Sequence, residues 1–465
     1  MKPVIAWFRS DLRLADNPML AAAHDSGKPV IAVYILDDVN PGIWKQGGAT
    51  RWWLHQSLAA LLQKIPLVLL KGDASKELLK LAEKTGAEEV FWNRCYEPWA
   101  IERDTKIKEA LKKKNIEAHS FNGFLLFEPW EIKNKTGSSY KVFTPYSRAC
   151  HERGGIRPPA GAAKKINFAK ADGLSLNDLG LMPDIKWYGG MAEFWQPGEE
   201  GAHKRLKRFA ADGASKYKAQ RDFPAVDGVS RLSPHLHFGE LSPHQVWDAL
   251  SGKVERAHDY LRQLLWREFS WHLLYHAPDF PEKPWNKQFT KFPWKKDKKL
   301  LRLWQKGNTG YPIVDAGMRQ LWQTGWMHNR VRMIVGSFLV KNLLLNWRDG
   351  EDWFWDTLVD ADLGNNAAGW QWIAGCGADA APYFRIFNPV LQSRKFDPAG
   401  EYIKKYIPEL KNLSSDYIHA PWEASPLELS AAGVTLGKTY PAPVVDLSES
   451  RDRALKAYSV SKSAA

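Results

Sequence analysis

One stretch of the sequence, residues 309–389, constrains the fold most, because it sets many tryptophans among paired arginines, asparagines and aspartates. Its indoles are Trp322, Trp326, Trp347, Trp353, Trp355, Trp370 and Trp372. Tryptophans at helical spacing usually fill a core, and buried Arg and Asp usually form structural ion pairs. An ordinary core, however, is built from Leu and Ile and does not need so many indoles beside charges. Aromatic planes among fixed donors and acceptors suit a flat heteroaromatic ligand that carries polar edges and phosphates.

The same stretch is predicted to be helical. Apolar side chains recur from 318 to 343 at the spacing of one helix face, which predicts a single helix there. About one turn of that helix carries the polar residues His328, Asn329, Arg330 and Arg332. A second polar group, DADLGNN at 360–366, stands just before Trp370 and Trp372. The sequence therefore predicts two polar clusters beside aromatic walls.

Charge and cysteine content limit the class of protein. The 465 residues include 65 Lys and Arg against 52 Asp and Glu, a formal net charge of +13. Such basicity points to a polyanionic partner, most simply nucleic acid. Cys95, Cys150 and Cys376 lie far apart without a CxxC pair, which fits a reducing compartment and argues against a metal site or a disulfide framework. No apolar run has the length of a signal peptide or a membrane span, so we expect a cytoplasmic protein without membrane association.

Three regions follow one another along the chain. Residues 1–130 alternate strand-like and helix-like segments, which predicts an α/β domain with a doubly wound parallel sheet. Residues 131–197 are rich in Gly, Pro and Lys and are expected to be a connector that is functional or wraps across a domain. Residues 198–465 are expected to form an all-α domain with a frayed C-terminal end. The expected strands are 4–8, 30–35, 67–70, 89–92 and 118–121, and the expected helices are 49–63, 75–85, 101–113, 202–211, 244–251 and 257–276.

A loop early in the helical region has the composition of a phosphate cradle. YKAQRDFP at 217–224 leads into VSRLSPHLHFGELSP at 229–243, where hydroxyls and backbone amides enter a helix. The alternative is an ordinary helix start, in which Ser233 caps a helix that begins at Pro234. Further on, the spacing of Gln263, Trp266 and Arg267 places them on one helical side.

The chain resembles the photolyase/cryptochrome family over nearly its whole length, and most of all bacterial class I-type cyclobutane pyrimidine dimer photolyases. The resemblance rests on TGYPIVDAGMRQL at 309–321, GWMHNRVRM at 325–333, DADLGNNAAGWQW at 360–372 and DAAPYFRIFNP at 379–389. The segments at 7–18 and 93–104 resemble the family's antenna domain. The resemblance implies an antenna domain at 1–130, a connector at 131–197 and a helical FAD-binding catalytic domain at 198–465.

The resemblance implies that FAD is held by several separate segments. The matching positions are Tyr217, Val229, Ser230, Arg231, Leu232, Ser233, Arg267, Asn329, Arg332, Asp360, Ala361, Asp362 and Asn366. Arg332 would pair with Asp360 through a bidentate contact that Lys could not copy. Asn366 matches the residue that faces flavin N5. An amide there does not titrate and is usual in repair enzymes, whereas Asp is usual in plant-type cryptochromes.

The resemblance also implies a pocket for a flipped pyrimidine dimer. Trp266 and Trp372 would wall this pocket, and Gln263, Asn329 and Met333 would complete its catalytic surface. Members that split cyclobutane dimers commonly carry Glu at the position of Gln263, and members that repair (6-4) products carry Gln. The (6-4) members, however, carry histidines at the positions of Asn329 and Met333. Two positions therefore favour cyclobutane chemistry and one opposes it, and an amide can still donate to a base carbonyl.

Other roles are implied by the same resemblance. Trp370, Trp347 and Trp294 match an electron-transfer chain from the flavin to the surface. The DNA contacts would be Arg221, Gln263, Trp266, Arg330 and Trp372, with a basic run at 295–302 as further phosphate contacts. Folate-binding members often carry an Asn-Glu pair just after the YE of this region, where this chain has Pro98, Trp99 and Ala100. This departure counts against a folate held in that manner, and a deazaflavin, a flavin or no antenna stay open.

These matches together imply light-driven DNA repair. Reduced FAD, excited by blue or near-ultraviolet light, would pass an electron to a flipped dimer, which splits and returns it; photolyases are among the enzymes that flip their target nucleotide. The expected partner is ultraviolet-damaged DNA, bound by a monomer. Two alternatives stay open: a cryptochrome-like photoreceptor without repair, which Asn366 opposes, and a (6-4) photolyase, which only Gln263 favours.

Overall fold

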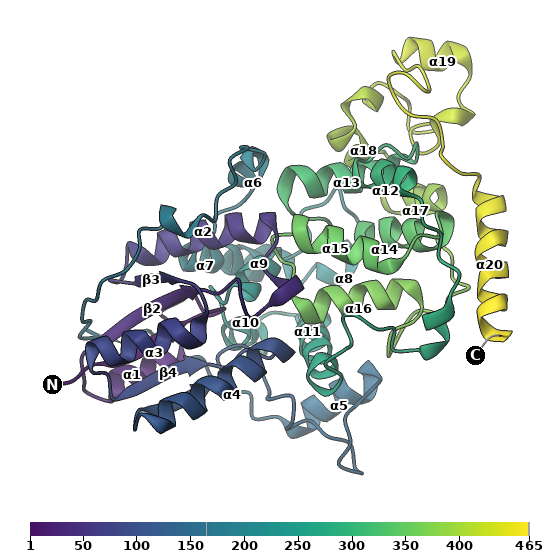
Figure 1. Cartoon of the computed structure of the whole chain (residues 1–465). Helices are drawn as coiled ribbons and strands as arrows, with labels where there is room; N and C mark the ends of the chain where they lie inside the picture. The colour runs from purple at the N-terminus through teal and green to yellow at the C-terminus, as the bar shows by residue number, and fades with distance from the viewer. Residues whose placement is uncertain (164, 464–465) are drawn as a thin grey trace.

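The computed structural model describes residues 1–163 and 165–463 and places a sheet-containing half beside an all-helical half (Figure 1). The strands are β1 (Val4–Phe8), β2 (Val30–Leu36), β3 (Val68–Lys71), β4 (Glu89–Asn93) and β5 (Glu117–Phe121). They form one sheet in the order β3-β2-β1-β4-β5, and every strand pair is parallel. Chain order runs outward from β1 in both directions, so the doubly wound sheet predicted from the sequence is confirmed.

Helices cover both faces of this sheet. They are α1 (Pro18–Asp25), α2 (Gly48–Leu62), α3 (Ala74–Thr85) and α4 (Pro98–Lys113), with a short 3-10 turn η1 (Gly42–Trp44) before α2. Val4 and Ala6 point into a cluster with residues of α1 and α2, whereas Ile5 and Trp7 share a cluster with α3 and α4. All residues of β1 and β2 are buried, as expected for parallel strands covered on both faces.

Helix α1 was not predicted, and its start explains why it forms. Asn17 accepts a hydrogen bond from the Leu20 amide at 3.2 Å, and Pro18 stands at the first helical position. Both features favour a helix start, because the cap satisfies an orphan amide and proline has none to satisfy. The remaining strands and helices of this half lie within a few residues of the predicted ranges.

The connector contains α5 (Phe143–Arg153), η2 (Asn177–Leu179) and α6 (Gly189–Phe194). It wraps over the sheet, where the amides of Ala169 and Leu174 donate to the carbonyls of Val30 and Leu69 at 2.9 and 2.8 Å. Further on, the Trp195 indole donates to the Thr324 carbonyl in the helical half at 2.7 Å. The segment therefore ties the two halves together.

The helical half is built from many short elements (Figure 1). They are α7 (Glu199–Arg208), the π-helix η3 (Phe209–Gly213), α8 (Tyr217–Gln220), α9 (Ser233–His237), α10 (Pro243–Leu250), α11 (His258–His276), η4 (Lys287–Lys291), α12 (Lys298–Gln305), α13 (Pro312–Thr324), α14 (Asn329–Ser337), the π-helix η5 (Phe338–Asn342), α15 (Trp347–Thr357), α16 (Leu363–Ala374), α17 (Pro389–Phe396), α18 (Glu401–Tyr406), η6 (Pro408–Leu410), η7 (Pro421–Glu423), α19 (Pro426–Ala431) and α20 (Leu447–Ser463).

The single helix predicted across 318–343 is wrong, because α13 ends before α14 begins. Gly325 follows α13 with φ +64°, a left-handed conformation that terminates helices. After it, the His328 side chain accepts from the Arg330 amide at 3.2 Å and caps α14. A side chain at Gly325 would also come within 2.6 Å of Met191 and Val359. The break gives Asn329 and its neighbours a helix of their own.

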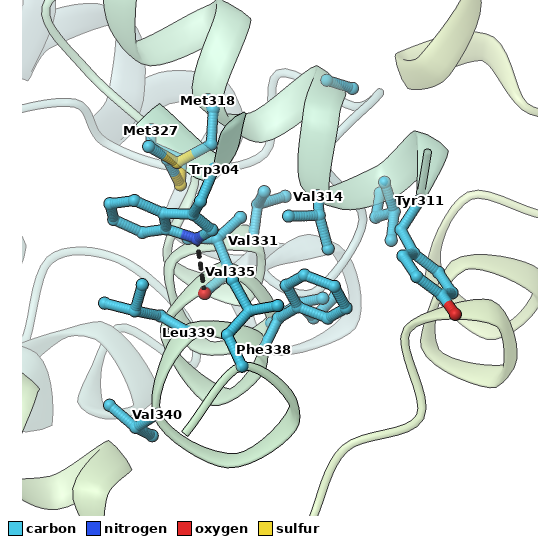
Figure 2. Close-up of a cluster of buried hydrophobic side chains, with 14 of the residues drawn as sticks. Trp304, Tyr311, Val314, Met318, Met327, Val331, Val335, Phe338, Leu339 and Val340 are labelled. Carbon is cyan, nitrogen blue, oxygen red and sulfur yellow. Dashed lines mark hydrogen bonds between the residues drawn. The ribbon is translucent and has the colours of Figure 1, made fainter. Parts of the chain in front are cut away.

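The core of this half includes apolar side chains of α12, α13 and α14, which pack against one another in one buried cluster (Figure 2). Trp304 of α12 is fully buried there, and its indole donates to the Val335 carbonyl of α14 at 3.0 Å. A buried indole needs such an acceptor, because an unpaired N–H would lose its hydrogen bond to water. The contact fixes α12 against α14.

The frayed C-terminal end predicted from the sequence is wrong as far as residue 463, where α20 ends; residues 464 and 465 lie outside the described residues. Tyr458 of α20 stacks on Tyr383 with ring centroids 4.7 Å apart, and Ser450 accepts from the Asn342 side chain at 2.9 Å. The helix is therefore docked by aromatic and polar contacts. Among the described residues, no helix is both long and apolar enough to cross a membrane.

Helices α15 and α16 approach each other at Gly350. A β-carbon added to Gly350 would overlap the indole of Trp370. We predict that Gly350→Ala lowers the free energy of unfolding by roughly 1–3 kcal/mol, because the added methyl overpacks this contact. Denaturant unfolding measures the change. Gly189→Ala is the matched control, since a β-carbon there meets no atom within 4 Å. Equal stability of the two variants would contradict the packing argument.

Candidate active site

A cavity of about 580 Å³ lies inside the helical half. Its lining comes from the loop before α9 and from α11, α14, α16 and the loop 377–380. Most of the residues singled out in the sequence line it: Tyr217, Arg221, Val229, Ser230, Arg231, Ser233, Gln263, Trp266, Arg267, Asn329, Arg332, Met333, Asp360, Ala361, Asp362, Asn366, Trp370 and Trp372. Segments that are far apart in the sequence thus meet at one concave site, the usual form of a cofactor site.

The loop 229–233 forms one wall and is held from behind by Arg205. The Arg205 Nε donates to the Ser230 carbonyl at 2.7 Å, and its Nη2 donates to the Val229 carbonyl at 2.9 Å. Arg231 has φ +52°, an uncommon conformation for a non-glycine residue. Because Arg205 engages these carbonyls, the amides of this loop other than that of Leu232, which donates to the Ser230 hydroxyl at 3.3 Å, are the groups suited to phosphate oxygens. Leu232 is fully buried in the core and does not line the cavity.

The alternative reading of Ser233 as a helix cap is wrong. Helix α9 begins at Ser233 itself, and Leu232 occupies the cap position without a side-chain hydrogen bond. The Ser233 hydroxyl instead donates to Asp360 Oδ2 at 2.6 Å, across 127 residues of sequence. This contact ties the loop to the polar cluster that precedes α16.

Arg332 and Asp360 form the predicted ion pair. One guanidinium nitrogen, Nη2, lies 3.1 and 2.9 Å from the two carboxylate oxygens of Asp360. The predicted bidentate fork is therefore wrong in detail, because the Nε of Arg332 donates to the Met327 carbonyl at 2.8 Å. That second contact orients the guanidinium plane in the cavity wall.

Asp362 and Asn366 sit at the start of α16. Asp362 is the cap residue and accepts from the Asn365 amide at 2.7 Å. Burial raises the pKa of Asp362 to about 6, although the Asn365 hydrogen bonds and Arg267 oppose that rise. The Asn366 amide nitrogen donates to the Glu351 carbonyl at 3.0 Å, so its oxygen is the atom left to accept from a ligand.

Arg267 supplies an observation that favours a polar ligand. It is buried, and its Nη1 donates to the Phe124 carbonyl at 3.0 Å and to Glu268 at 3.2 Å. Its Nη2 has no partner among the described residues. A buried charged donor without a partner indicates a missing acceptor. With the loop amides, the amide and carboxylate groups and the indole of Trp370, the lining fits the phosphates, polar edge and flat ring of FAD.

Four predicted site residues do not line the cavity: Leu232, Arg330, Trp347 and Trp294. The Arg330 Nη2 donates to Asp222 Oδ1 at 2.8 Å, and the Arg330 guanidinium carbon lies 4.3 Å from the centroid of the Phe396 ring. Trp347 is 2% exposed and shares a core with Trp370, and Trp294 packs against the edge of that core. The predicted electron-transfer roles of these tryptophans stay predictions.

Several lining residues were missed in the sequence. Tyr260 donates to the Ser230 hydroxyl at 2.9 Å, and Trp326, Met327, Phe354 and Asp379 complete the walls. Tyr260 precedes Gln263 by three residues, so helical spacing could have placed it on the same face. Asp379 lies on a loop, where no periodicity could reveal it.

The charged loop after β1 is a buried structural network. The Arg9 Nη1 lies 2.6 Å from Asp104 Oδ2, and the Asn93 Nδ2 donates to Asp11 Oδ2 at 2.6 Å. Arg13 donates to the Gly123 carbonyl at 2.7 Å and to Gly239 of the helical half at 2.9 Å. Each of these charged groups thus has a charged or polar partner in the network, although the Arg9 Nε has none among the described residues.

Comparisons with known proteins agree with this architecture. Residues 4–163 match a family model described as DNA photolyase, and residues 260–460 match the FAD binding domain of DNA photolyase. The deoxyribodipyrimidine photo-lyase of Agrobacterium fabrum is 49% identical over 474 residues, which cover 99% of this chain and 98% of that protein. Cryptochrome-1 of Arabidopsis thaliana is 38% identical, over 98% of this chain and 70% of the plant protein.

Solved structures show the same relationship. A bacterial class III photolyase from Agrobacterium tumefaciens superposes with a TM-score of 0.96 at 47% identity, covering 100% of this chain and 98% of that chain. An archaeal photolyase from Sulfolobus tokodaii, described with two FAD molecules, has a TM-score of 0.84 at 30% identity, with 98% and 100% coverage. The Agrobacterium tumefaciens structure is described as a class III photolyase, whereas the resemblance in the sequence was to the class I type. Sequence, fold and cavity together assign the chain to the photolyase/cryptochrome family, with that family's FAD-binding domain in its helical half.

Proposed function

We propose that this protein is a light-driven DNA repair enzyme that splits cyclobutane pyrimidine dimers. The observation that carries the proposal is the composition of the cavity: Trp266, Trp372, Gln263 and Met333 line the same space as the flavin-matching residues. Reduced FAD, when bound and excited, supplies an electron to the dimer and recovers it after the bonds break. The chain contributes a pocket in which a flipped dimer lies beside that cofactor.

Indoles suit the proposed substrate. A flipped pyrimidine pair presents flat, partly apolar rings, and aromatic faces bind nucleobases by stacking. Gln263 and Asn329 add neutral amides that can donate to base carbonyls. A neutral donor stabilises negative charge on a carbonyl oxygen without adding a charge that repels it. The two kinds of side chain would therefore hold the dimer and stabilise its reduced form.

Repair of (6-4) products is the weaker alternative. That reaction moves a group between two bases and needs proton transfer from a positioned acid, a task suited to histidine. Asn329 and Met333 occupy the two matching positions, and neither is an acid. His328 is next to Asn329 but is 1% exposed, and burial lowers its pKa to about 4, so it is neutral. Only Gln263 favours (6-4) chemistry.

A photoreceptor without repair is the alternative from a different class, and it is favoured by the plant cryptochrome relatives at 38 and 39% identity. Repair is preferred because Asn366 supplies an amide where plant-type cryptochromes usually have Asp. The positive charge of the chain and Arg221 on the cavity wall add support for a DNA partner.

The first functional prediction concerns Arg332. Arg332→Ala removes the cation beside buried Asp360, so FAD affinity should fall about tenfold or more, because a charged hydrogen bond contributes about 1.5–3 kcal/mol. FAD retained after dialysis measures the change. Arg319→Ala is the control, since Arg319 pairs with Glu409 at 2.6 Å and does not line the cavity. Unchanged FAD affinity in Arg332→Ala would contradict the proposed flavin contact.

The second prediction concerns light-driven reduction of oxidised FAD. Trp370→Phe should abolish it, because the Trp370 indole is the proposed first electron donor. Repair by chemically pre-reduced enzyme should survive, since repair does not use that donor. Absorbance under blue light follows the reduction. Trp326→Phe is the matched control, as Trp326 also lines the cavity but lies outside the proposed chain. Photoreduction that persists in Trp370→Phe would show another route.

The third prediction concerns the lesion. Purified protein should restore cyclobutane-dimer oligonucleotides under blue light and show little activity on (6-4) oligonucleotides. Gln263→Glu should change the cyclobutane rate by less than roughly tenfold, about 1.4 kcal/mol of barrier, because either side chain can hydrogen-bond the bases. Chromatography of repaired strands measures both reactions. Efficient (6-4) repair by the wild-type protein would overturn the lesion assignment and leave the flavin assignment intact.

A further inference from the structure

We infer that Phe143, the first residue of α5 in the connector, is a positioning residue for Trp266 and makes the connector part of the lesion site. The inference rests on the proposed function, in which Trp266 contacts the flipped dimer. Phe143 is distant in sequence from Trp266, and neither the family-matching motifs nor the cavity lining include it.

The first observation is a face-to-face stack. The ring centroids of Phe143 and Trp266 lie 3.7 Å apart, and the ring planes differ by 9°. Phe143 is 1% exposed, whereas Trp266 is half-buried and lines the cavity. One face of the Trp266 indole is therefore covered by a ring that is itself fixed in the core. Contact with a ligand is left to the opposite face and the ring edge.

Neighbouring groups close the space around this stack. Phe269 lies edge-on to Phe143 and to Trp266, with centroid distances of 5.9 Å in both cases. The Arg262 guanidinium, one helical turn before Trp266, lies 5.0 Å from the Phe143 ring centroid. Phe143 and Phe269 therefore block rotation of the Trp266 indole toward the core, and only the side that faces the cavity is open.

The second observation is how Phe143 is held. Its backbone amide donates to Asp379 Oδ2 at 2.9 Å, and Asp379 lines the cavity. This amide is in the first turn of α5, where N–H groups have no acceptor within the helix, and the cap residue Val142 offers no side-chain hydrogen bond. The carboxylate thus satisfies a helix start and ties the cavity rim to the ring behind Trp266.

This arrangement preorganises a stacking wall. When the indole is already held in place, binding of a base costs less conformational entropy than when the base must also order the indole. Removing the Phe143 ring should weaken binding of damaged DNA by roughly three- to tenfold, the size of one aromatic stacking contact. The flavin should be unaffected, because Phe143 does not line the cavity.

The test is a double-mutant cycle on the holoenzyme, since coupling between two residues isolates their mutual effect. Wild-type protein, Phe143→Leu, Trp266→Leu and the double variant are compared for affinity to a cyclobutane-dimer duplex and to the same undamaged duplex. FAD content and photoreduction report whether each variant is folded. We expect Phe143→Leu to weaken binding of the damaged duplex alone, and to have no further effect once Trp266 is replaced. Phe143→Tyr, which keeps a stacked ring, should restore affinity.

The outcomes separate the two proposals. Two results overturn the positioning role. In the first, Trp266→Leu loses affinity for the damaged duplex and Phe143→Leu does not. In the second, Phe143→Leu lowers the affinity equally whether or not Trp266 is present. Equal affinity of the wild-type protein for damaged and undamaged duplex contradicts the proposed function itself. Should Phe143→Leu lose FAD, Phe143→Met, an apolar side chain of similar length without a ring, provides the second test. It should weaken damaged-duplex binding while Phe143→Tyr retains it; equal affinity of these two variants overturns the inference.

Discussion

The structure of the site depends on one carboxylate, Asp360, which three separate segments share. The Ser233 hydroxyl brings the loop before α9 to it, and Arg332 brings α14. Asp360 itself belongs to the turn that leads into α16. A buried carboxylate costs free energy unless charged and polar donors satisfy it, so both contacts stabilise the meeting of these segments. The cavity is lined by Ser233, Arg332 and Asp360, one residue from each segment.

Buried carboxylates also join the two halves of the molecule. Glu268 of α11 accepts from the amides of Leu126 and Phe127 at 2.8 and 3.3 Å, and burial raises its pKa to about 7. Glu240 accepts from the Trp53 indole of α2 at 2.9 Å. Glu268 links a helix of the cavity half to a segment of the sheet half, and Glu240, in the loop between α9 and α10, links the cavity half to α2. The sheet domain therefore supports the helices that line the site.

The sequence predicted the sheet almost completely and the helical half only in part. Parallel strands buried on both faces are continuous apolar runs such as VIAWF, which local pattern reveals. Apolar spacing alone could not show the break at Gly325, because α13 and α14 bury the same stripe on either side of it. The Ser233 hydroxyl was misassigned for a related reason: its partner, Asp360, is 127 residues away. Phe143 and Asp379 lie in segments without periodicity, so only the fold places them near Trp266.

The central claim is that the chain holds a dimer beside a light-excited cofactor that is returned to its starting state. The most direct test is a single-flash experiment on pre-reduced enzyme with a duplex carrying one cyclobutane dimer. The account predicts recovery of pyrimidine absorbance after each flash, with no net consumption of the reduced cofactor and none of this recovery in the dark. Recovery without light, or cofactor oxidation in step with each dimer split, would contradict it.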